Sequence, residues 1–249
     1  MLVDMHSQLL KLPGSRYEND EDALRILKSA AADGITHIIA TPLYRNEGYI
    51  NKNQEIGSYV NKLNTKLLGL DIPVTVFEGM EIVLYEKIVQ DIKLKLLPLA
   101  ESNKYIFIGF RAQRIPDFTL NVFFEMQLMG YIPVIANVER NMDLMNNPQK
   151  IQEFVSKGAL IHVGAASILG LNGRNTRKKA LKLCRSGLVQ LITSASPGSK
   201  SGPSLLKPAY DYLGKKLTPR TVDYFIRNAE SVISGSDFHI QKPTEFRRT

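Results

Sequence analysis

Short runs of apolar and β-branched residues recur along the chain, separated by longer stretches that mix polar and apolar positions. Each run is too short for an ordinary helix, and several are apolar on both faces, which is typical of strands buried in a parallel sheet. The pattern therefore predicts seven strands. They cover residues 2–5, 37–41, 74–83, 105–110, 132–138, 160–164 and 189–194.

The stretches between these runs carry apolar residues three or four positions apart, the spacing of one helix face. Gly34 is a typical helix end, and Thr218 before Pro219 is a typical helix start. Strands that alternate with helices predict a parallel α/β domain. A closed or nearly closed barrel related to the (β/α)₈ type is the first interpretation, and an open doubly wound sheet is the second. The predicted helices cover residues 20–32, 53–68, 117–129, 148–158, 175–185, 205–216 and 219–233.

Length and composition narrow the class of protein. The 249 residues fit one large domain, residues 1–249, and residues 235–249 contain no clear element, so we expect a C-terminal tail there. The single cysteine, Cys184, excludes an internal disulfide and a zinc finger. No signal sequence and no long apolar run is visible, and together with the lone thiol this predicts a cytoplasmic protein.

The net charge of +8, from 32 Lys and Arg against 24 Asp and Glu, favours an acidic partner. The charge is most concentrated in the predicted helix 175–185 and the residue before it, where no acidic residue occurs. This segment is interpreted either as a solvated face or as a surface for an acidic protein, a membrane or nucleic acid. No aromatic residue is interleaved, which weakens the nucleic-acid alternative. The candidate basic surface consists of Arg174, Arg177, Lys178, Lys182 and Arg185.

Polar residues near the carboxyl ends of the predicted strands are the candidates for chemistry, because barrel active sites lie at that end. The set is sparse for a metal-dependent hydrolase, which needs several His, Asp or Glu ligands. The candidates are His6, Gln8, Glu81, Asn137 and Ser194.

Motifs at these same positions resemble the manganese-dependent protein-tyrosine phosphatases of capsule and exopolysaccharide loci, which belong to the polymerase-and-histidinol-phosphatase (PHP) superfamily. The family's Gly-Ile-Thr-x-Ile-Ile-Ala-Thr-Pro is found at residues 34–42 and its Gly-x-Glu-Ile at 79–82. Its Gly-Tyr-x-Pro segment, which ends in Glu-Arg-Asn, is found at 130–141. The resemblance implies a PHP-type distorted (β/α)₇ barrel and, as family activity, metal-dependent phosphotyrosine hydrolysis.

Most positions that hold metal ligands in this family are occupied by other residues here. The changed positions are Gln8, Leu43, Gly109, Asn137, Ala195 and Pro197. Leu, Gly, Ala and Pro offer a cation no lone pair, and Gln and Asn offer only weak neutral ligands. His6 and Glu81 remain, so the sequence predicts an inactive pseudophosphatase that acts by binding, with no metal and no other cofactor. The alternative is an active metal-dependent phosphatase with a reorganised site, which holds manganese weakly at His6 and Glu81.

Two residues are candidates for binding phosphate or another anion. Arg140 matches the family motif in which an arginine lies near the phosphate, although a structural ion pair is the competing interpretation. Lys200 lies in a Ser- and Gly-rich stretch that is either an anion-binding loop or a solvated one. The resemblance suggests an acidic or phosphotyrosine-bearing partner, such as a bacterial tyrosine kinase or its adaptor. A nucleic acid or a membrane surface is the less favoured partner.

Overall fold

The computed structural model describes residues 1–7, 9–10, 20–44, 53–111, 113–194, 204–238, 240–241 and 243; of residues 20, 53, 54 and 101 it describes the backbone alone. The strands in this part of the chain are β1 (Val3–Ser7), β2 (His37–Ala40), β3 (Leu43–Tyr44), β4 (Thr75–Glu78), β5 (Glu81–Val83), β6 (Tyr105–Gly109), β7 (Ile132–Ile135), β8 (Leu160–Gly164) and β9 (Leu191–Thr193). The α-helices are α1 (Asp20–Ala32), α2 (Asn53–Gly69), α3 (Ile88–Lys95), α4 (Thr119–Leu128), α5 (Met142–Asn146), α6 (Pro148–Ser156), α7 (Ala165–Leu169), α8 (Arg174–Arg185), α9 (Leu206–Lys216) and α10 (Pro219–Ser234). Two short 3₁₀ helices, η1 (Ala100–Ser102) and η2 (Val138–Arg140), complete the described elements.

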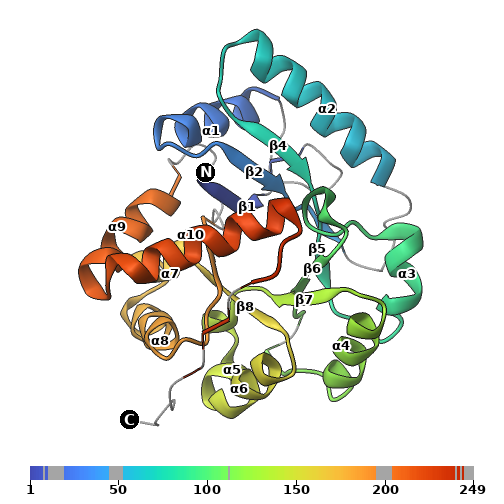
Figure 1. Cartoon of the computed structure of the whole chain (residues 1–249), viewed down its shortest axis with the longest axis vertical. Helices are drawn as coiled ribbons and strands as arrows, with labels where there is room; N and C mark the ends of the chain where they lie inside the picture. Colours follow the sequence, from blue (N-terminus) through green and yellow to red (C-terminus); the bar gives the residue numbers. More distant parts are fainter. Residues whose placement is uncertain are drawn as a thin grey trace.

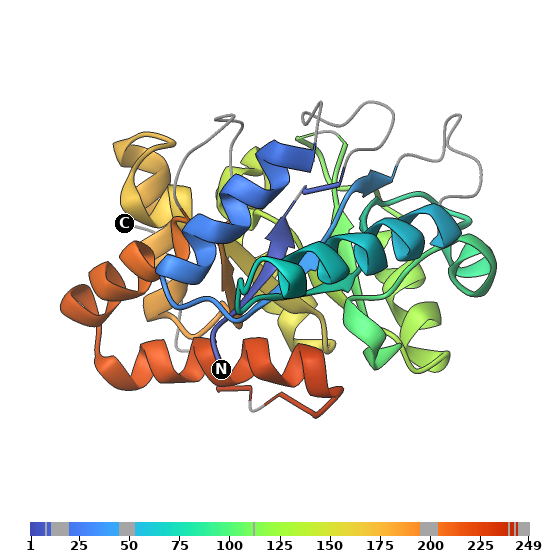
Figure 2. The ribbon, with the colours of Figure 1, turned by 90° about the horizontal axis from the view of Figure 1, so that it is seen from above.

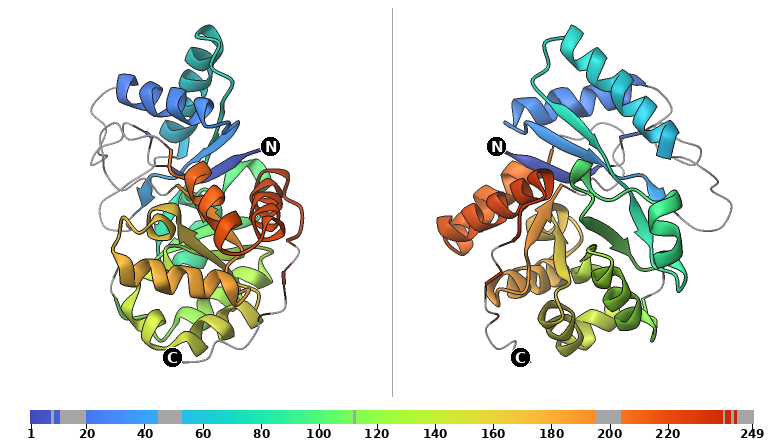
Figure 3. Two further views of the ribbon diagram at one scale, coloured as in Figure 1. Left: turned by 90° about the vertical axis from the view of Figure 1, so that its left-hand side faces the viewer. Right: turned by 45° about the vertical axis from the view of Figure 1, so that its right-hand side comes forward.

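The strands form two parallel sheets that curl around a common interior (Figure 1). Strands β1, β2 and β4 make a three-stranded sheet, and the larger sheet has the order β3-β5-β6-β7-β8-β9. Strands β1 and β9 lie against each other where the two sheets meet. Helices cover the outside, with α1 and α2 over the smaller sheet (Figure 3). The predicted α/β class, with parallel strands curled into a barrel-like arrangement, is confirmed, and the described part of the chain contains nine strands where seven were predicted.

The third predicted strand is divided into β4 and β5, which belong to different sheets. The chain crosses between the sheets at Gly79, where a Cβ atom would lie 2.7 Å from Cγ2 of Ile39 on β2. Glycine is needed there because any side chain would collide with the neighbouring strand. The division separates two nearby glutamates. The carboxylate of Glu78 lies beside Gly57 on α2, whereas Glu81 lies at the end of the barrel that is described below.

The interior of the barrel is filled by apolar side chains from alternate positions of the strands. Tyr105 and Phe107 on β6 are fully buried there, and burial of each contributes about 1.5–3 kcal/mol. Helix α10 lies across the end at which the strands begin and adds Ala229 and Val232 to this core (Figure 2). Thr218 caps α10 as predicted, since its Oγ1 accepts a hydrogen bond from the Thr221 amide. The opposite end is therefore the open one.

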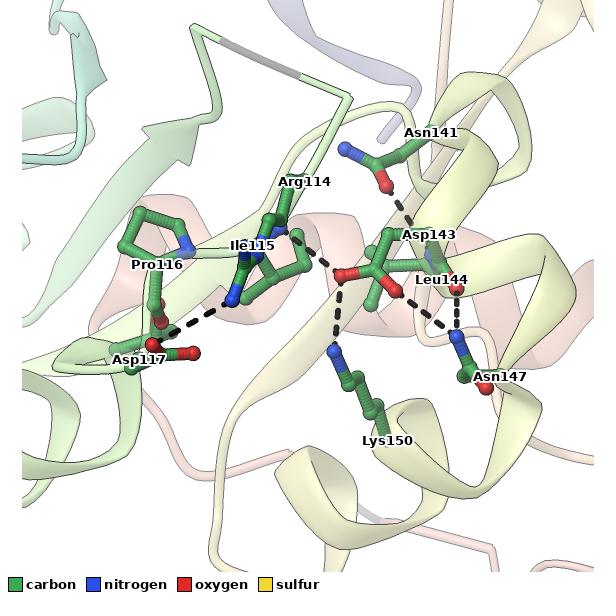
Figure 4. A network of polar contacts seen from close by, with 10 residues as sticks. Arg114, Ile115, Pro116, Asp117, Asn141, Asp143, Leu144, Asn147 and Lys150 are labelled. Carbon is green, nitrogen blue, oxygen red and sulfur yellow. Dashed lines mark hydrogen bonds and ion pairs between the residues drawn. The ribbon is translucent and has the colours of Figure 1, made fainter.

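A polar network fixes α5 beside the open end (Figure 4). Oδ2 of Asp143 accepts hydrogen bonds from the Ile115 amide at 3.0 Å and from Lys150 Nζ at 2.8 Å, and Oδ1 accepts from Asn147 Nδ2 at 2.9 Å. Asn141 caps α5 by accepting a hydrogen bond from the Leu144 amide. The hydrogen bonds from Lys150 and from the Ile115 amide lower the pKa of Asp143 to about 2. Asp143 is therefore ionised at neutral pH and ties α6 and the segment before α4 to α5.

Part of the predicted C-terminal tail is held against β6. The hydroxyl of Tyr105 donates to the Ser236 carbonyl, and Lys104 Nζ lies 2.6 Å from Oδ1 of Asp237. The ring of Phe238 packs on Tyr105 with centroids 5.0 Å apart. Among the helices described, none is long and apolar enough to cross a membrane.

Candidate functional site

Polar side chains from distant parts of the sequence gather at the open end of the barrel. His6 comes from β1, Glu81 from β5 and His162 from β8. The rings of His6 and His162 have centroids 5.8 Å apart, and Phe107 packs against them at 4.8 and 5.2 Å, respectively. Because parallel strands end at one edge of the sheet, three residues far apart in sequence form a single cluster around an aromatic ring.

His6 and Glu81 form a buried pair. Nε2 of His6 lies 2.9 Å from Oε2 of Glu81, and their side chains are 7% and 13% exposed. Burial acts to raise the pKa of Glu81, but the charge and the hydrogen bond of His6, together with the charge of Arg140, lower it overall. Gly109 leaves room for this pair, since a Cβ atom there would lie 2.8 Å from Oε1 of Glu81. The carboxylate therefore occupies the space beside Gly109.

The side chain of Asp4, on β1, is a second buried carboxylate. It accepts hydrogen bonds from the amide of Ser194 at 3.0 Å, from the hydroxyl of Ser194 and, at 3.5 Å, from the amide of His6. Burial raises the pKa of Asp4 although these hydrogen bonds act to lower it. Ser194, one of the predicted site residues, is thus held by Asp4 and joins the end of β9 to β1.

His162 is a structural histidine. Its Nδ1 accepts a hydrogen bond from the amide of Asn137 at 3.1 Å, so the proton of the neutral ring lies on Nε2 and is donated to Oγ1 of Thr193 at 2.8 Å. Burial, followed by the charge of His6, lowers the pKa of His162 well below its usual value. The predicted site residue Asn137 has φ 51° and contributes its amide to this network. Both hydrogen-bonding atoms of the His162 ring are therefore used within the protein.

Arg140 is exposed and lines a cavity of about 320 Å³ between η2, α5 and α8. Amide, hydroxyl and ammonium groups of Asn141, Asn172, Thr176 and Lys179 line the same cavity. Within the described residues Arg140 forms no ion pair, although its charge acts on the nearby carboxylates of Glu139 and Glu81. The donors and the two cationic side chains suit an anion, and the lining also includes the acidic residue Glu139 and the apolar residues Met142 and Met145.

Glu139 lies beneath Arg140 and is 2% exposed. Its Oε1 accepts hydrogen bonds from the hydroxyl of Ser167 at 2.6 Å and from the amide of Gly164 at 3.3 Å. Burial raises the pKa of Glu139, while these hydrogen bonds and the charge of Arg140 oppose the shift. Glu139 thus fixes the junction between β8 and α7 under the cavity.

The predicted basic surface lies on α8. Arg174, Arg177, Lys178 and Arg185 line a groove of about 270 Å³ against α9. Lys182 is not among its lining residues. Helix α9 adds Tyr212 and Lys216 to the groove, which the sequence pattern of α8 alone did not indicate.

Manganese, implied by the family resemblance, requires more ligands than the described residues bring together. A catalytic zinc site, for example, normally has three protein ligands and an open position. In the part of the chain that the structure describes, no group of three or more His, Cys, Asp or Glu side chains is arranged to hold a metal ion. His6 and Glu81 satisfy each other, and His162 is occupied by Thr193. The described residues alone therefore do not complete a metal site.

Several predicted residues lie outside the described part of the chain: Gln8, Ala195, Pro197 and Lys200. Asp4 and Thr193 were not predicted as site residues. In the sequence, Asp4 stands out as a charged residue within an apolar strand. In the structure it is buried, and buried carboxylates rarely lack a partner. Thr193 gave no such signal, since threonine is common in strands.

Comparison with known proteins places the whole chain among relatives of one kind. A family model described as capsular polysaccharide synthesis, CpsB/CapC, matches residues 2–234. The putative tyrosine-protein phosphatase CapC of Staphylococcus aureus is 31% identical over 248 residues, which cover 98% of this chain and 96% of the relative. The tyrosine-protein phosphatase YwqE of Bacillus subtilis (strain 168) is 29% identical over 247 residues, which cover 99% of this chain and 97% of the relative.

Solved structures agree with the sequence comparison. A chain from the crystal structures of YwqE from Bacillus subtilis and CpsB from Streptococcus pneumoniae, described as unique metal-dependent tyrosine phosphatases, superposes with a TM-score of 0.90. The match has 29% identity and covers 99% of this chain and 100% of that chain. The histidinol phosphate phosphatase of Lactococcus lactis superposes with a TM-score of 0.52 at 13% identity, covering 96% of this chain and 94% of that chain, a likeness of fold alone.

These findings overturn the prediction of an inactive pseudophosphatase. Relatives at 29–31% identity over nearly the full length are named as tyrosine-protein phosphatases, so a protein that only binds is the wrong interpretation. The expected absence of a metal cofactor is contradicted as well, because the superposed relatives are described as metal-dependent. The prediction was wrong because it equated the loss of familiar metal ligands with the loss of catalytic activity. The number of familiar metal ligands describes only one way in which a site can be built. Catalysis also depends on proton transfer and on phosphate binding.

Proposed function

The chain belongs to the CpsB/CapC family of capsular polysaccharide synthesis, and from this premise we propose that it is an active tyrosine-protein phosphatase with a reorganised site. The observation that carries the proposal is the similarity to named tyrosine-protein phosphatases over 98% and 99% of the chain. The open end of the barrel supports it with a histidine–carboxylate pair and an exposed arginine. The described residues alone do not complete a metal site, so each step below is assigned to this chain's own side chains.

Arg140 binds the phosphate group of the substrate. Its guanidinium is exposed at the cavity and carries a planar set of donors that match two phosphate oxygens. Lys179 and Asn172 line the same cavity and add an ammonium and an amide donor. The phosphate is thereby placed at the open end of the barrel. Arg140 lies near enough to Glu81 for its charge to lower the pKa of that carboxylate.

Glu81 orients His6 for proton transfer. Its Oε2 accepts the hydrogen on His6 Nε2, so in the neutral ring the free lone pair is on Nδ1. Nδ1 of His6 is buried and has no hydrogen-bond partner in the described part of the chain, so the attacking water must enter with the substrate to reach it. In the proposed reaction this atom takes a proton from the water as its oxygen bonds to phosphorus, the bond between phosphorus and the tyrosine oxygen breaks, and the imidazolium returns the proton to the leaving tyrosine oxygen. The ionised Glu81 stabilises this imidazolium, as the carboxylate does in a serine-protease triad.

The proposed substrate is a phosphotyrosine-bearing protein of a capsule or exopolysaccharide system, and a bacterial tyrosine kinase or its adaptor is the proposed partner. We place the reaction in the cytoplasm, where a protein with one buried thiol, Cys184, needs no disulfide. One domain, residues 1–249, is the proposed unit, in keeping with a family model that matches residues 2–234.

Phosphate release from a phosphotyrosyl peptide and from the same peptide with phosphoserine tests the proposal. Each peptide is assayed with added manganese and again after EDTA treatment and dialysis. We expect the phosphotyrosyl peptide to be hydrolysed faster by about tenfold or more, because a tyrosine phenolate is a better leaving group than a serine alkoxide. Folding is checked by circular dichroism in every condition. A folded protein that releases no phosphate with or without manganese contradicts the proposal.

A further inference from the structure

A strongly basic groove runs between α8 and α9 on the outside of the barrel. Its volume is about 270 Å³, and no carboxylate lines it. Figure 1 places α8 between α9 and α5, so the groove and the Arg140 cavity lie on two sides of one helix. The cations that line the groove are Arg174, Arg177, Lys178, Arg185 and Lys216.

The groove cations lack the ion pairs that several basic residues form elsewhere in the described part of the chain. Lys95 pairs with Asp91 and Lys207 with Asp211, both at 2.9 Å, whereas none of the five groove cations forms an ion pair within the described residues. Like charges this close repel one another, and each stays solvated at some cost to the fold. A ligand that carries several negative charges removes this repulsion.

Helix stability does not explain where the cations at the start of α8 lie. Arg174 and Arg177 lie in the first turn of α8, which contains no acidic residue, and a cation at a helix N-terminus opposes the helix dipole. Arg177 also packs its Cδ and Nη1 against Gly170, so its guanidinium is positioned by the protein. Arg185, in the last turn, is favoured by the helix dipole, but Arg174 and Arg177 gain neither from the dipole nor from an ion pair within the described residues, and recognition of an anion is consistent with their position.

The shape of the groove favours a polypeptide over a flat or a regular polyanion. It is a hollow between two helices that is wide enough for side chains, and Tyr212 forms one wall with Lys216 Nζ 5.9 Å from its ring centroid. A bilayer surface is flat and does not enter such a hollow. With only one aromatic ring, the groove lacks the series of stacking platforms used by single-stranded nucleic acids.

We propose that this α8–α9 groove docks an acidic segment of the phosphoprotein substrate while its phosphotyrosine lies at Arg140. This rests on the proposed function, because the other side of α8 supplies Thr176 and Lys179 to the Arg140 cavity. A bound chain therefore needs only to pass over the first turns of α8 to reach both sites. The groove selects substrates by the charge that flanks the phosphotyrosine and adds affinity without touching the reacting atoms.

Steady-state kinetics of a double charge reversal, Arg174→Glu with Lys178→Glu, test the groove. Both side chains are exposed, so the variant is expected to fold. Two phosphotyrosyl peptides are compared, one with a run of glutamates beside the phosphotyrosine and one with glutamines at those positions. For the acidic peptide we expect KM to rise about tenfold with kcat changed less than about twofold. Kinetics on the glutamine peptide and on a small aryl phosphate should stay the same.

A matched control separates the groove from net charge. Lys62→Glu with Lys93→Glu changes the net charge by the same amount at two exposed lysines on α2 and α3. This control is expected to leave KM for the acidic peptide within about twofold of the wild type, since the lysines lie outside the groove. An equal rise of KM in both double variants, or no rise in either, overturns the groove proposal.

Fluorescence anisotropy with an acidic peptide that carries no phosphotyrosine makes the groove testable without turnover. One outcome is that the wild type binds this peptide, that the Arg174/Lys178 variant does not bind it, and that neither assay detects hydrolysis of phosphotyrosine. In that case the groove proposal stands and the proposed phosphatase function fails. If hydrolysis occurs but flanking charge has no effect on binding or KM, the groove fails and the function stands. Stronger binding to a DNA duplex or to phosphatidylserine vesicles than to the peptide, lost in the same variant, overturns the polypeptide assignment.

Discussion

Two aspartates of this molecule are both fixed by hydrogen bonds, yet their pKa values shift in opposite directions. Asp143 is held by Lys150 and by the Ile115 amide, and its pKa falls to about 2 (Figure 4). Asp4 is bonded to Ser194 and forms no ion pair within the described residues, and burial raises its pKa. The two networks contain the same functional group and differ in how deeply it is buried and in whether a lysine pairs with it.

The difference separates a structural network from a functional one. A carboxylate paired with a cation stabilises the fold, as Asp143 does around α5. A carboxylate buried without a cation costs folding free energy, and such costs are concentrated at functional sites. Asp4 lies two residues from His6, whose pair with Glu81 leaves Nδ1 unused. The open end of the barrel therefore contains a buried carboxylate with a raised pKa and an unpartnered histidine nitrogen close together in sequence.

Replacing Glu81 by glutamine should lower activity more than the substitutions at Arg140, Gly109, Asp143 or Asp4. Glu81→Gln removes the charge that orients His6 and stabilises its imidazolium, so we expect kcat for a phosphotyrosyl peptide to fall by about 10²–10³-fold. The exposed Glu125 on α4 supplies the control Glu125→Gln, which should behave as wild type. Initial rates of phosphate release measure the effect of each variant, and circular dichroism checks that both variants are folded. A wild-type rate for Glu81→Gln removes this residue from the mechanism.

Replacing Arg140 by lysine should weaken phosphate binding while keeping the charge. Lysine lacks the planar donors of the guanidinium, so Arg140→Lys is expected to raise KM about tenfold, with a smaller change in kcat. Arg114→Lys, at an exposed arginine 3.6 Å from Asp117, is the matched control and should leave KM unchanged. Equal KM values for both variants would show that the cavity does not hold the phosphate.

Adding a methyl group at Gly109 should disturb the mouth of the barrel without unfolding it. The new Cβ would lie 2.8 Å from Oε1 of Glu81, whose flexible side chain can rotate away and lose its contact with His6. We expect Gly109→Ala to lower kcat about tenfold and to change the unfolding free energy by about 1 kcal/mol or less. Gly214→Ala, at a helical glycine where the nearest atom to a Cβ would be 3.8 Å away, is the control. An unchanged kcat contradicts the placement of Glu81.

Neutralising the two aspartates should have opposite effects on stability. The lowered pKa of Asp143 means that its stabilisation is present above its unfolded-state pKa near 3.8 and is lost as pH falls toward about 2. At pH 7, Asp143→Asn should therefore lower the unfolding free energy by about 1 kcal/mol. The raised pKa of Asp4 means that stability is greatest at low pH and declines as pH rises through the folded pKa.

Asp4→Asn cannot ionise, so we expect it to be at least as stable as the wild type at pH 7, with the advantage gone at about pH 3. Urea unfolding of both variants across this pH range measures the difference. The contrast between the two networks fails if both variants lose stability in parallel at every pH.

The sequence predicted most of the fold because buried strands and long amphipathic helices leave strong local patterns. The division of the third strand at Gly79 was not predictable, since the close approach depends on Ile39 from another strand. Helices α3, α5 and α7, of eight, five and five residues, were missed because such short segments carry little periodicity.

The candidate site was predictable only where motifs mark it. His6, Glu81 and Arg140 were found from motif positions, and the structure places them at the open end. The bond between Asp4 and Ser194 joins residues 190 positions apart, and no local pattern reports such a contact. The prediction of inactivity was wrong because each metal-ligand position was judged separately from the rest of the site. Gln8 and Lys200 lie outside the described residues, and their roles remain predictions.

The central claim is that the open end of the barrel, with His6 as the proton acceptor, hydrolyses phosphotyrosine. Its most direct test compares kcat/KM for a phosphotyrosyl peptide in His6→Ala and in His37→Ala. His37 begins β2 at the opposite end, where it bonds to Thr36 and stacks on Phe77, so it serves as the matched histidine. We predict a fall of about 10²–10⁴-fold for His6→Ala and a change below about twofold for His37→Ala. A His6→Ala protein that keeps the wild-type rate contradicts the claim.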